Sequence, residues 1–222
     1  MGIEQNVQDL QRRIAGACEQ VGRSPDEVTL VAVTKTIEVP AIEAAFNAGI
    51  RNFGENRVQE AKPKIEQLES LRAQLTWHMV GHLQTNKAKT AVDIFGIIHS
   101  VDSLRLAEAL SRHSQKRLPV LIEVNVAAEA TKGGFGLPEV DEAIRQIGRL
   151  PNIEIEGLMT LAPWVSDAEE VRPVFRRLRQ LGDALGLRHI SMGMTDDFEV
   201  AIEEGATLVR IGRAIFGERR MA

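Results

Sequence analysis

The chain has 222 residues, a formal net charge of −4, one cysteine and no tyrosine. One cysteine excludes an internal disulfide framework and a multi-cysteine metal site, and the slight excess of acidic residues gives no basic field for nucleic acid. With 44% hydrophobic residues the chain can bury a substantial core, yet no apolar run approaches the roughly 18–20 residues needed to span a bilayer. The N-terminus lacks a signal-peptide pattern, so we expect a soluble cytoplasmic protein without membrane or nucleic-acid partners.

Apolar runs of strand type alternate along the chain with segments of helical periodicity. The first helical segment covers about residues 3–21 and ends at Gly22, so an extra helix precedes the first strand. Pro40 is expected to open the next helix, and Asp102 to cap the helix after the fourth strand. The expected strands lie at residues 29–34, 51–54, 75–80, 94–99, 119–126, 153–159, 189–191 and 206–211.

This alternation of strands and helices predicts an α/β fold. Strands that alternate with helices form right-handed βαβ units and a parallel sheet. Eight such units in this length favour a closed (β/α)8 TIM barrel with an extra N-terminal helix over an open doubly wound sheet, which usually has fewer strands. No linker or change of composition marks a boundary, so we expect a single domain over residues 1–222.

Several familiar motifs fail at the positions that define them. The spacing of His78 and His82 suits metal ligands on a helix, but they lie at the end of an expected strand. Ordinary polar residues near a strand end are the simpler interpretation. The glycines at 134 and 136 lack the third glycine of a dinucleotide fingerprint, and those at 212 and 217 lack the lysine of a phosphate loop. The sequence therefore predicts no metal site.

Lys35 follows a run of apolar residues and stands at the carboxyl end of the first expected strand. In a (β/α)8 barrel that end faces the mouth, where active sites lie. A lysine there pairs with a carboxylate, holds an anion or acts as an amine, and desolvation favours the neutral amine that imine formation requires. An ion pair with Glu55 and a reactive amine are both open at this point.

Two turns follow the seventh and eighth expected strands, where barrels of this type often bind phosphate. Gly193 and Gly212 allow an anion to approach the backbone closely, and Ser191 and Thr195 offer hydroxyl groups. Each turn alone fits an ordinary loop, but the two together favour a phosphate site. The acidic residues at 196–197 would repel a phosphate, so we expect them to act as cap and surface residues. A phosphorylated aldehyde, pyridoxal 5′-phosphate (PLP), bound as an imine to the strand-one lysine, suits both features.

Six motifs occur in order over nearly the whole chain: VAVTKT at 31–36, FGENRVQE at 53–60, WHMVGHLQTNK at 77–87, GLM at 157–159, SMGMTDD at 191–197 and VRIGRAIFG at 209–217. With these motifs the chain resembles the pyridoxal phosphate homeostasis protein family, a single barrel similar to the N-terminal barrel of alanine racemase. The resemblance implies an imine-forming lysine, an arginine facing the pyridine nitrogen, two phosphate-binding turns and two pocket-lining residues. Lys35 matches the imine-forming lysine, and Arg210 matches the arginine facing the pyridine nitrogen. The positions of the two phosphate-binding turns are matched by Ser191, Thr195, Gly212 and Arg213. The pocket-lining residues are matched by Asn56 and Met159.

Two matching positions depart from residues common in the family. Thr195 stands where serine is frequent and keeps the hydroxyl, whereas Arg213 stands where serine or threonine is common and leaves its side-chain role open. At position 210 an arginine facing the pyridine nitrogen would keep that nitrogen unprotonated, because a guanidinium does not readily give up a proton. The ring is then a weaker electron sink. A salt bridge of Arg210 at the barrel mouth is the alternative.

Three functions fit these residues. The resemblance implies a PLP-binding protein of intracellular PLP homeostasis, not an enzyme, which would pass the cofactor to apo forms of PLP-dependent enzymes. A PLP-dependent amino-acid racemase is the second, although alanine racemase uses a tyrosine from a second domain, and this chain lacks tyrosine and has room for the barrel only. A Schiff-base phosphosugar aldolase is the third. We favour the first, as a monomer.

Overall fold

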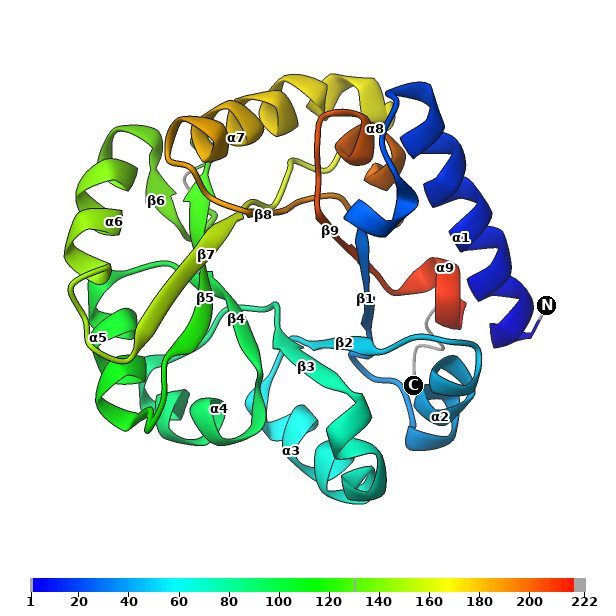
Figure 1. The fold of residues 1–222 in the computed structure, drawn as a ribbon, viewed down its shortest axis with the longest axis horizontal. Coiled ribbons are helices and arrows are strands. Elements are labelled where there is room, and N and C mark those ends of the chain that lie inside the picture. Colours follow the sequence, from blue (N-terminus) through cyan, green and yellow to red (C-terminus); the bar gives the residue numbers. More distant parts are fainter. Residues whose placement is uncertain (1, 130, 218–222) are drawn as a thin grey trace.

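Eight parallel strands form a closed barrel in the computed structural model, which describes residues 2–129 and 131–217 (Figure 1). Each strand pairs with the next, and the last pairs with the first to close the ring. A two-residue strand, β6 (Phe135–Gly136), pairs only with the end of the fifth strand. The barrel strands are β1 (Thr29–Val33), β2 (Asn52–Glu55), β3 (Thr76–Met79), β4 (Ile97–Val101), β5 (Leu118–Asn125), β7 (Ile153–Met159), β8 (His189–Ser191) and β9 (Leu208–Ile211). The predicted (β/α)8 barrel is confirmed.

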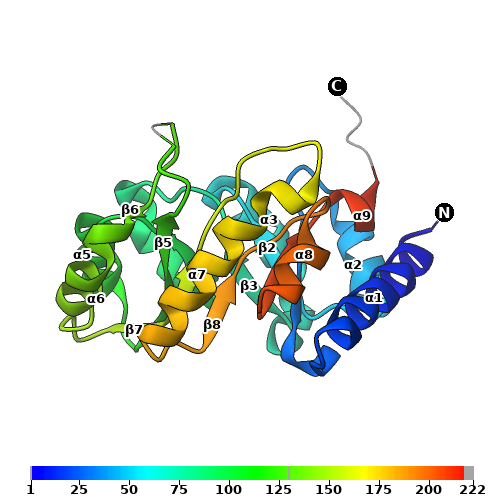
Figure 2. The same ribbon diagram turned by 90° about the horizontal axis from the view of Figure 1, so that it is seen from above.

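Helices surround the barrel and cover its outer face (Figures 1 and 2). The expected N-terminal helix, α1 (Ile3–Gln20), packs against α2, α8 and α9. Among the described residues no helix is both long and apolar enough to cross a bilayer. The other helices are α2 (Val39–Asn47), α3 (Val58–Gln67), α4 (Ala88–Ile94), α5 (Leu104–His113), α6 (Val140–Ile147), α7 (Arg172–Ala184), α8 (Phe198–Glu203) and α9 (Arg213–Phe216), with 3-10 turns at Pro25–Glu27, Glu69–Gln74, Thr85–Lys87, Leu137–Glu139 and Ala168–Val171.

The start of one strand and the cap of one helix differ from those predicted from the sequence. Ile94, expected to open the fourth strand, is the last residue of α4. Apolar residues run from the end of this helix into the strand without a polar break, so periodicity could not separate the two elements. Ser103, not Asp102, caps α5, because its hydroxyl accepts the Leu106 N–H at 3.3 Å. Asp102 instead lies 2.9 Å from the ring of His82.

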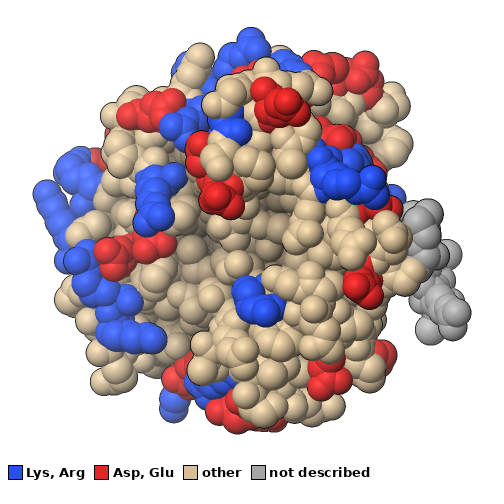
Figure 3. All heavy atoms as spheres, turned by 45° about the vertical axis from the view of Figure 1, so that its right-hand side comes forward, with Lys and Arg blue, Asp and Glu red and all other residues tan. Residues whose placement is uncertain are grey.

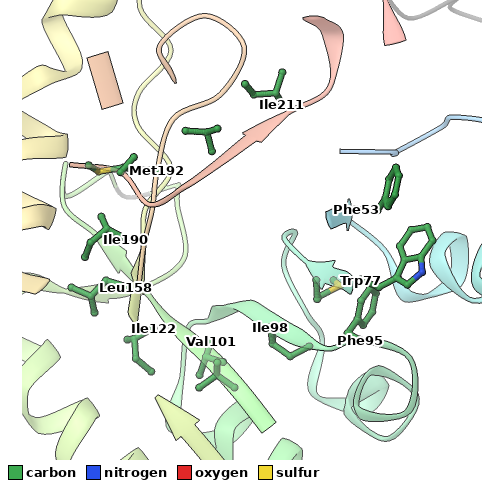
Figure 4. Close-up of a cluster of buried hydrophobic side chains, with 14 of the residues drawn as sticks. Phe53, Trp77, Phe95, Ile98, Val101, Ile122, Leu158, Ile190, Met192 and Ile211 are labelled. Carbon is green, nitrogen blue, oxygen red and sulfur yellow. The ribbon is translucent and has the colours of Figure 1, made fainter. Parts of the chain in front are cut away.

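The barrel wall separates two hydrophobic clusters, because successive residues of a strand face opposite sides. The larger cluster fills the space between strands and helices, where Phe53, Trp77 and Phe95 lie close together in Figure 4. Fully buried Phe175 brings α7 into the same cluster. The smaller cluster contains Val31, Val80, Ile97, Leu121, Met159 and Leu208. We name these clusters the outer layer and the inner cluster.

Candidate cofactor site

Lys35 lies just beyond β1 and lines a cavity of 670 Å³ at the barrel mouth. The connections that follow β2 and β3 form the rest of the cavity, and Asn56, His82 and Lys87 belong to its lining. Within the described part of the chain, the Lys35 amine makes no hydrogen bond or ion pair, whereas the buried Asn56 Oδ1 lacks a hydrogen-bond partner. The structure therefore brings together a partly buried amine and a buried polar acceptor.

Glu55, considered above as a partner for Lys35, pairs with a different lysine. Lys64 of α3 places its Nζ 2.6 Å from Glu55 Oε1 and 2.7 Å from the Thr34 carbonyl oxygen. The Thr34 hydroxyl donates a second bond to the same carboxylate oxygen at 2.7 Å. Because Glu55 is fully buried and already compensated, Lys35 does not act as its counter-ion. Lys64, which lies nine residues from Glu55, was not predicted from the sequence as its partner.

The two turns expected to bind phosphate lie next to each other and next to β1. A Cβ atom added to Gly212 would lie 3.2 Å from the Val33 carbonyl oxygen, so the turn after β9 runs against the end of β1 close to Lys35. The Arg210 N–H donates to the Gly193 carbonyl at 3.0 Å and ties the loop after β8 to β9. Gly193 has a φ of 88°, and its packing against Ala201 leaves no room for a side chain.

These turns supply backbone donors and one surface ion pair. Within the described residues, the N–H groups of Thr195, Gly212 and Ala214 make no hydrogen bond to the protein. The exposed Arg213 pairs with Asp196 and so links the two turns side chain to side chain. Three N–H groups in adjoining turns are the kind of donor set that binds a phosphate group.

Asp197 differs from its expected place at the surface. It stands at the N-cap position of α8 but is 9% exposed, and its carboxylate accepts the Met194 N–H at 2.5 Å within the loop. Burial raises the pKa of Asp197, while this hydrogen bond and the positive charge of Arg210 act in the opposite direction. Asp197 thus shapes the loop after β8 from inside.

A row of hydrogen bonds, named here the inner polar row, joins five side chains inside the barrel. Arg210 Nη1 donates to Ser191 Oγ, which lies 2.9 Å from His99 Nδ1. His99 Nε2 lies 2.9 Å from His78 Nδ1, and His78 Nε2 lies 3.0 Å from Asn52 Oδ1. Four of the five side chains are buried, and Asn52 is half-buried. His78, interpreted above as an ordinary polar residue, is therefore a buried member of a network that the sequence analysis missed.

Arg210 is held without an ion pair. Its Nη2 donates to the Thr160 carbonyl at 2.8 Å, and among the described residues no carboxylate lies within 4 Å of its guanidinium. The salt bridge considered above for Arg210 is therefore not found. Burial lowers the pKa of Arg210 to about 10, with the more distant charges of Asp197 and Glu123 acting the other way. The guanidinium remains protonated at neutral pH.

The two buried histidines are neutral for the same physical reason. Burial lowers the pKa of His78 to about 3 and holds the pKa of His99 well below its usual range, because the charged ring loses its hydration. Nearby, burial and the charge of Asp102 raise the pKa of Glu123 at the end of β5. Met159, the remaining predicted pocket residue, is fully buried in the inner cluster on β7.

The site therefore offers three kinds of group to a ligand. Lys35 provides an amine, the adjoining turns provide backbone N–H donors, and Arg210 provides a buried guanidinium. Figure 3 shows charges of both signs spread over the visible surface without a broad field of one sign, as the low net charge indicates.

Comparison with known proteins first gives the class of barrel. Residues 3–220 match the family described as alanine racemase, N-terminal domain. The pyridoxal phosphate homeostasis protein of Aquifex aeolicus is 45% identical, and the alignment covers 94% of each chain. The protein of that name from Escherichia coli K12 is 42% identical over 98% of this chain and 97% of its own length. Among solved structures, PipY of Synechococcus elongatus with PLP bound is 35% identical, with a TM-score of 0.84 and coverage of 97% of this chain and all of PipY. The chain belongs to the pyridoxal phosphate homeostasis protein family.

Proposed function

We propose that this protein binds PLP as an imine on Lys35 and takes part in intracellular PLP homeostasis, holding and releasing the cofactor without a turnover reaction of its own. One observation carries the proposal. Lys35, whose amine has no ion-pair partner in the described chain, directly follows the end of β1, and the Gly212 turn with its backbone donors runs against that same strand end. The PLP held by the related PipY supports the same assignment.

The phosphate group is assigned to the two adjoining turns. Thr195 offers a hydroxyl and an N–H, and Gly212 offers an N–H on the side next to β1. Ser191 belongs to the same loop, but its hydroxyl already lies between Arg210 and His99, so it acts by fixing the loop. Arg213 joins the two turns through its pair with Asp196.

The other predicted residues surround the ring. Asn56 is assigned to the pocket wall through its unpaired Oδ1, and Met159 to the apolar side of the pocket. Arg210 donates a hydrogen bond to the pyridine nitrogen in this proposal. When bound, PLP supplies an aldehyde that condenses with amines and a ring that withdraws electrons. Because Arg210 keeps its proton at neutral pH, it leaves the ring nitrogen unprotonated and weakens this withdrawal.

This electronic effect favours storage over turnover. A cofactor with weak electron withdrawal is held by the protein but does little carbanion chemistry, as a carrier requires. We extend the proposal to a monomeric, cytoplasmic protein of a single domain. Its candidate recipients are apo forms of PLP-dependent enzymes.

The visible spectrum of the purified protein tests the proposal. We expect a yellow imine band after incubation with PLP, lost in Lys35→Ala and kept in Lys87→Ala, a lysine that lines the same cavity. A wild-type protein that stays colourless with PLP, or a Lys35→Ala protein that keeps the band, contradicts the proposal. Racemisation of alanine or serine by the holoprotein at enzymatic rates would favour the racemase. Borohydride trapping of Lys35 only with a sugar phosphate present would favour the aldolase.

A further inference from the structure

The hydrogen bonds of the inner polar row can run in only one direction. Arg210 has donors and no acceptor, so Ser191 Oγ accepts from it. Because the far end of the row, Asn52 Oδ1, also only accepts and each neutral ring carries one N–H, Ser191 donates its own hydrogen to His99 Nδ1. His99 then carries its proton on Nε2 and donates to His78 Nδ1. His78 likewise donates from Nε2 to Asn52 Oδ1, which can only accept.

The row also specifies the charge of both rings. A second proton on His78 would place two N–H groups against each other across the 2.9 Å between His99 Nε2 and His78 Nδ1, and a second proton on His99 would lie on Nδ1 and remove the acceptor of the Ser191 hydrogen. Both rings are buried, and no carboxylate within 4 Å compensates a positive charge on either of them among the described residues. Neutral rings with the proton on Nε2 therefore satisfy every nitrogen in the row.

We propose that His78 and His99 are positioning residues for Arg210. They keep the Ser191 hydroxyl turned toward His99, so its lone pairs always face Arg210 Nη1. With Nη2 fixed on the Thr160 carbonyl, the guanidinium has one orientation, and its remaining N–H groups make no hydrogen bond to the described residues. The assignment of that ligand as the pyridine nitrogen of PLP rests on the proposed function; the orientation of Arg210 does not.

The arrangement also determines what Ser191 can do. Its single hydrogen is donated to His99, so it has none left for a phosphate oxygen. The loop after β8 would then bind an anion through Thr195 and backbone N–H groups alone. The histidines thus separate the roles of two hydroxyl groups that lie four residues apart in one loop.

Nitrogen NMR of the ring atoms in the apoprotein tests the direction of the row without any cofactor. We expect both His78 and His99 to be neutral at neutral pH, with the proton on Nε2. We also expect slowly exchanging guanidinium N–H signals from Arg210, because two of its nitrogens are hydrogen-bonded and buried. A protonated ring, or a ring with its proton on Nδ1, would overturn the proposal whether or not PLP binds.

Variants of the row test its effect on Arg210. In His99→Leu we expect faster exchange of the Arg210 guanidinium protons, an altered imine band and an affinity for PLP lower by about ten-fold, the size of a lost hydrogen bond to a charged group. Imine formation on Lys35 should persist, because the amine is untouched. His99→Gln, which keeps one acceptor and one donor, should recover part of each change. His113→Gln on α5, outside the row, should change none of them.

Ser191→Ala provides a smaller break in the same row if His99→Leu does not fold. It should likewise loosen the Arg210 guanidinium in the apoprotein. Unchanged Arg210 exchange in the folded variants would overturn the positioning role. If wild-type protein fails to bind PLP while Arg210 still loosens, the proposed function fails and the positioning role stands.

Discussion

The two sides of the barrel wall are built from different chemistry. The outer layer, between strands and helices, consists almost entirely of apolar side chains such as Phe53 and Phe175. The inside of the barrel also contains apolar residues, but the inner polar row, with two histidines and an arginine, lies among them. Outside, non-directional contact suffices and neighbours can adapt; inside, each polar atom needs a particular partner. The outer layer therefore supports the fold, whereas the inside determines the orientation of the site.

Glu55 is the informative exception to this division. It is a fully buried carboxylate in the outer layer, yet its partners Lys64 and Thr34 come from the same layer. The charge is compensated locally and is not connected to the inner polar row by any hydrogen bond of the described residues. The contribution of the outer layer to stability and that of the inner polar row to the site can therefore be tested separately.

The largest effect is expected from a cavity in the outer layer. Phe175→Ala should lower the free energy of unfolding by roughly 3–5 kcal/mol, because a fully buried ring is replaced by a void. Urea unfolding measures this loss, with Trp164→Ala, an 89% exposed position, as the control that changes little. Folded Phe175→Ala should still show the wild-type PLP spectrum. An altered spectrum in the fully folded variant would show that the outer layer also affects the site.

Disturbing the ion pair between Glu55 and Lys64 should lower the free energy of unfolding almost as much. Lys64→Met leaves Glu55 buried without its ion-pair partner and should destabilise the protein by about 3 kcal/mol. Adding Glu55→Gln should recover part of this loss, and chemical denaturation of the single and double variants gives the coupling between them. Additive effects in that cycle would show that the two side chains do not compensate each other.

Acid should weaken the inside of the barrel selectively. The pKa of His78 falls from 6.5 in the unfolded chain to about 3 in the folded protein, so its contribution is complete above pH 6.5 and is lost as the pH falls toward 3. Between pH 7 and pH 5 this histidine alone should account for about 2 kcal/mol of lost stability. Unfolding at the two pH values, compared with His78→Gln, isolates the effect. Equal losses in both proteins would assign the acid sensitivity elsewhere.

The smallest effect is expected at the exposed link between the turns. Arg213→Ala should change the free energy of unfolding by less than about 1 kcal/mol, because its pair with Asp196 is surrounded by water. Asp196→Asn should have a similar small effect, measured in the same denaturation series. A loss of several kcal/mol in either variant would show that this link belongs to the interior of the site.

The sequence predicted well what depends on neighbouring residues. The run at 29–34 identified β1 because its residues are apolar on both faces, and Lys35 stood out as the charge at its end. The start of β4 failed because Ile94 ends a helix with the same apolar composition as the strand. The single-domain organisation and the roles of the individual site residues stay predictions.

The side-chain contacts that could not be predicted from the sequence depend on closure of the barrel. His78 and His99 lie on adjacent strands, and Ser191 and Arg210 lie about a hundred residues further along the chain. No linear spacing connects them. The available signal was a histidine within each of two otherwise apolar strands, an arrangement that requires buried partners. Lys64 was missed similarly, because its contact with Glu55 depends on how α3 packs against β2.

The bond between His99 and Ser191 has a consequence for how the molecule is made. It joins residues 92 positions apart, and ring closure joins β1 to β9, the last strand of the barrel to leave a ribosome. Until those late segments emerge, His99 Nδ1 lacks the Ser191 hydroxyl that it contacts in the complete barrel. The inner polar row and the ring of strands can therefore be completed only after β8 and β9 have been made, through contacts between distant parts of the chain. A nascent chain stopped before β8 would contain His78, His99 and Asn52 but not Ser191 and Arg210, the end from which the inner polar row takes its direction.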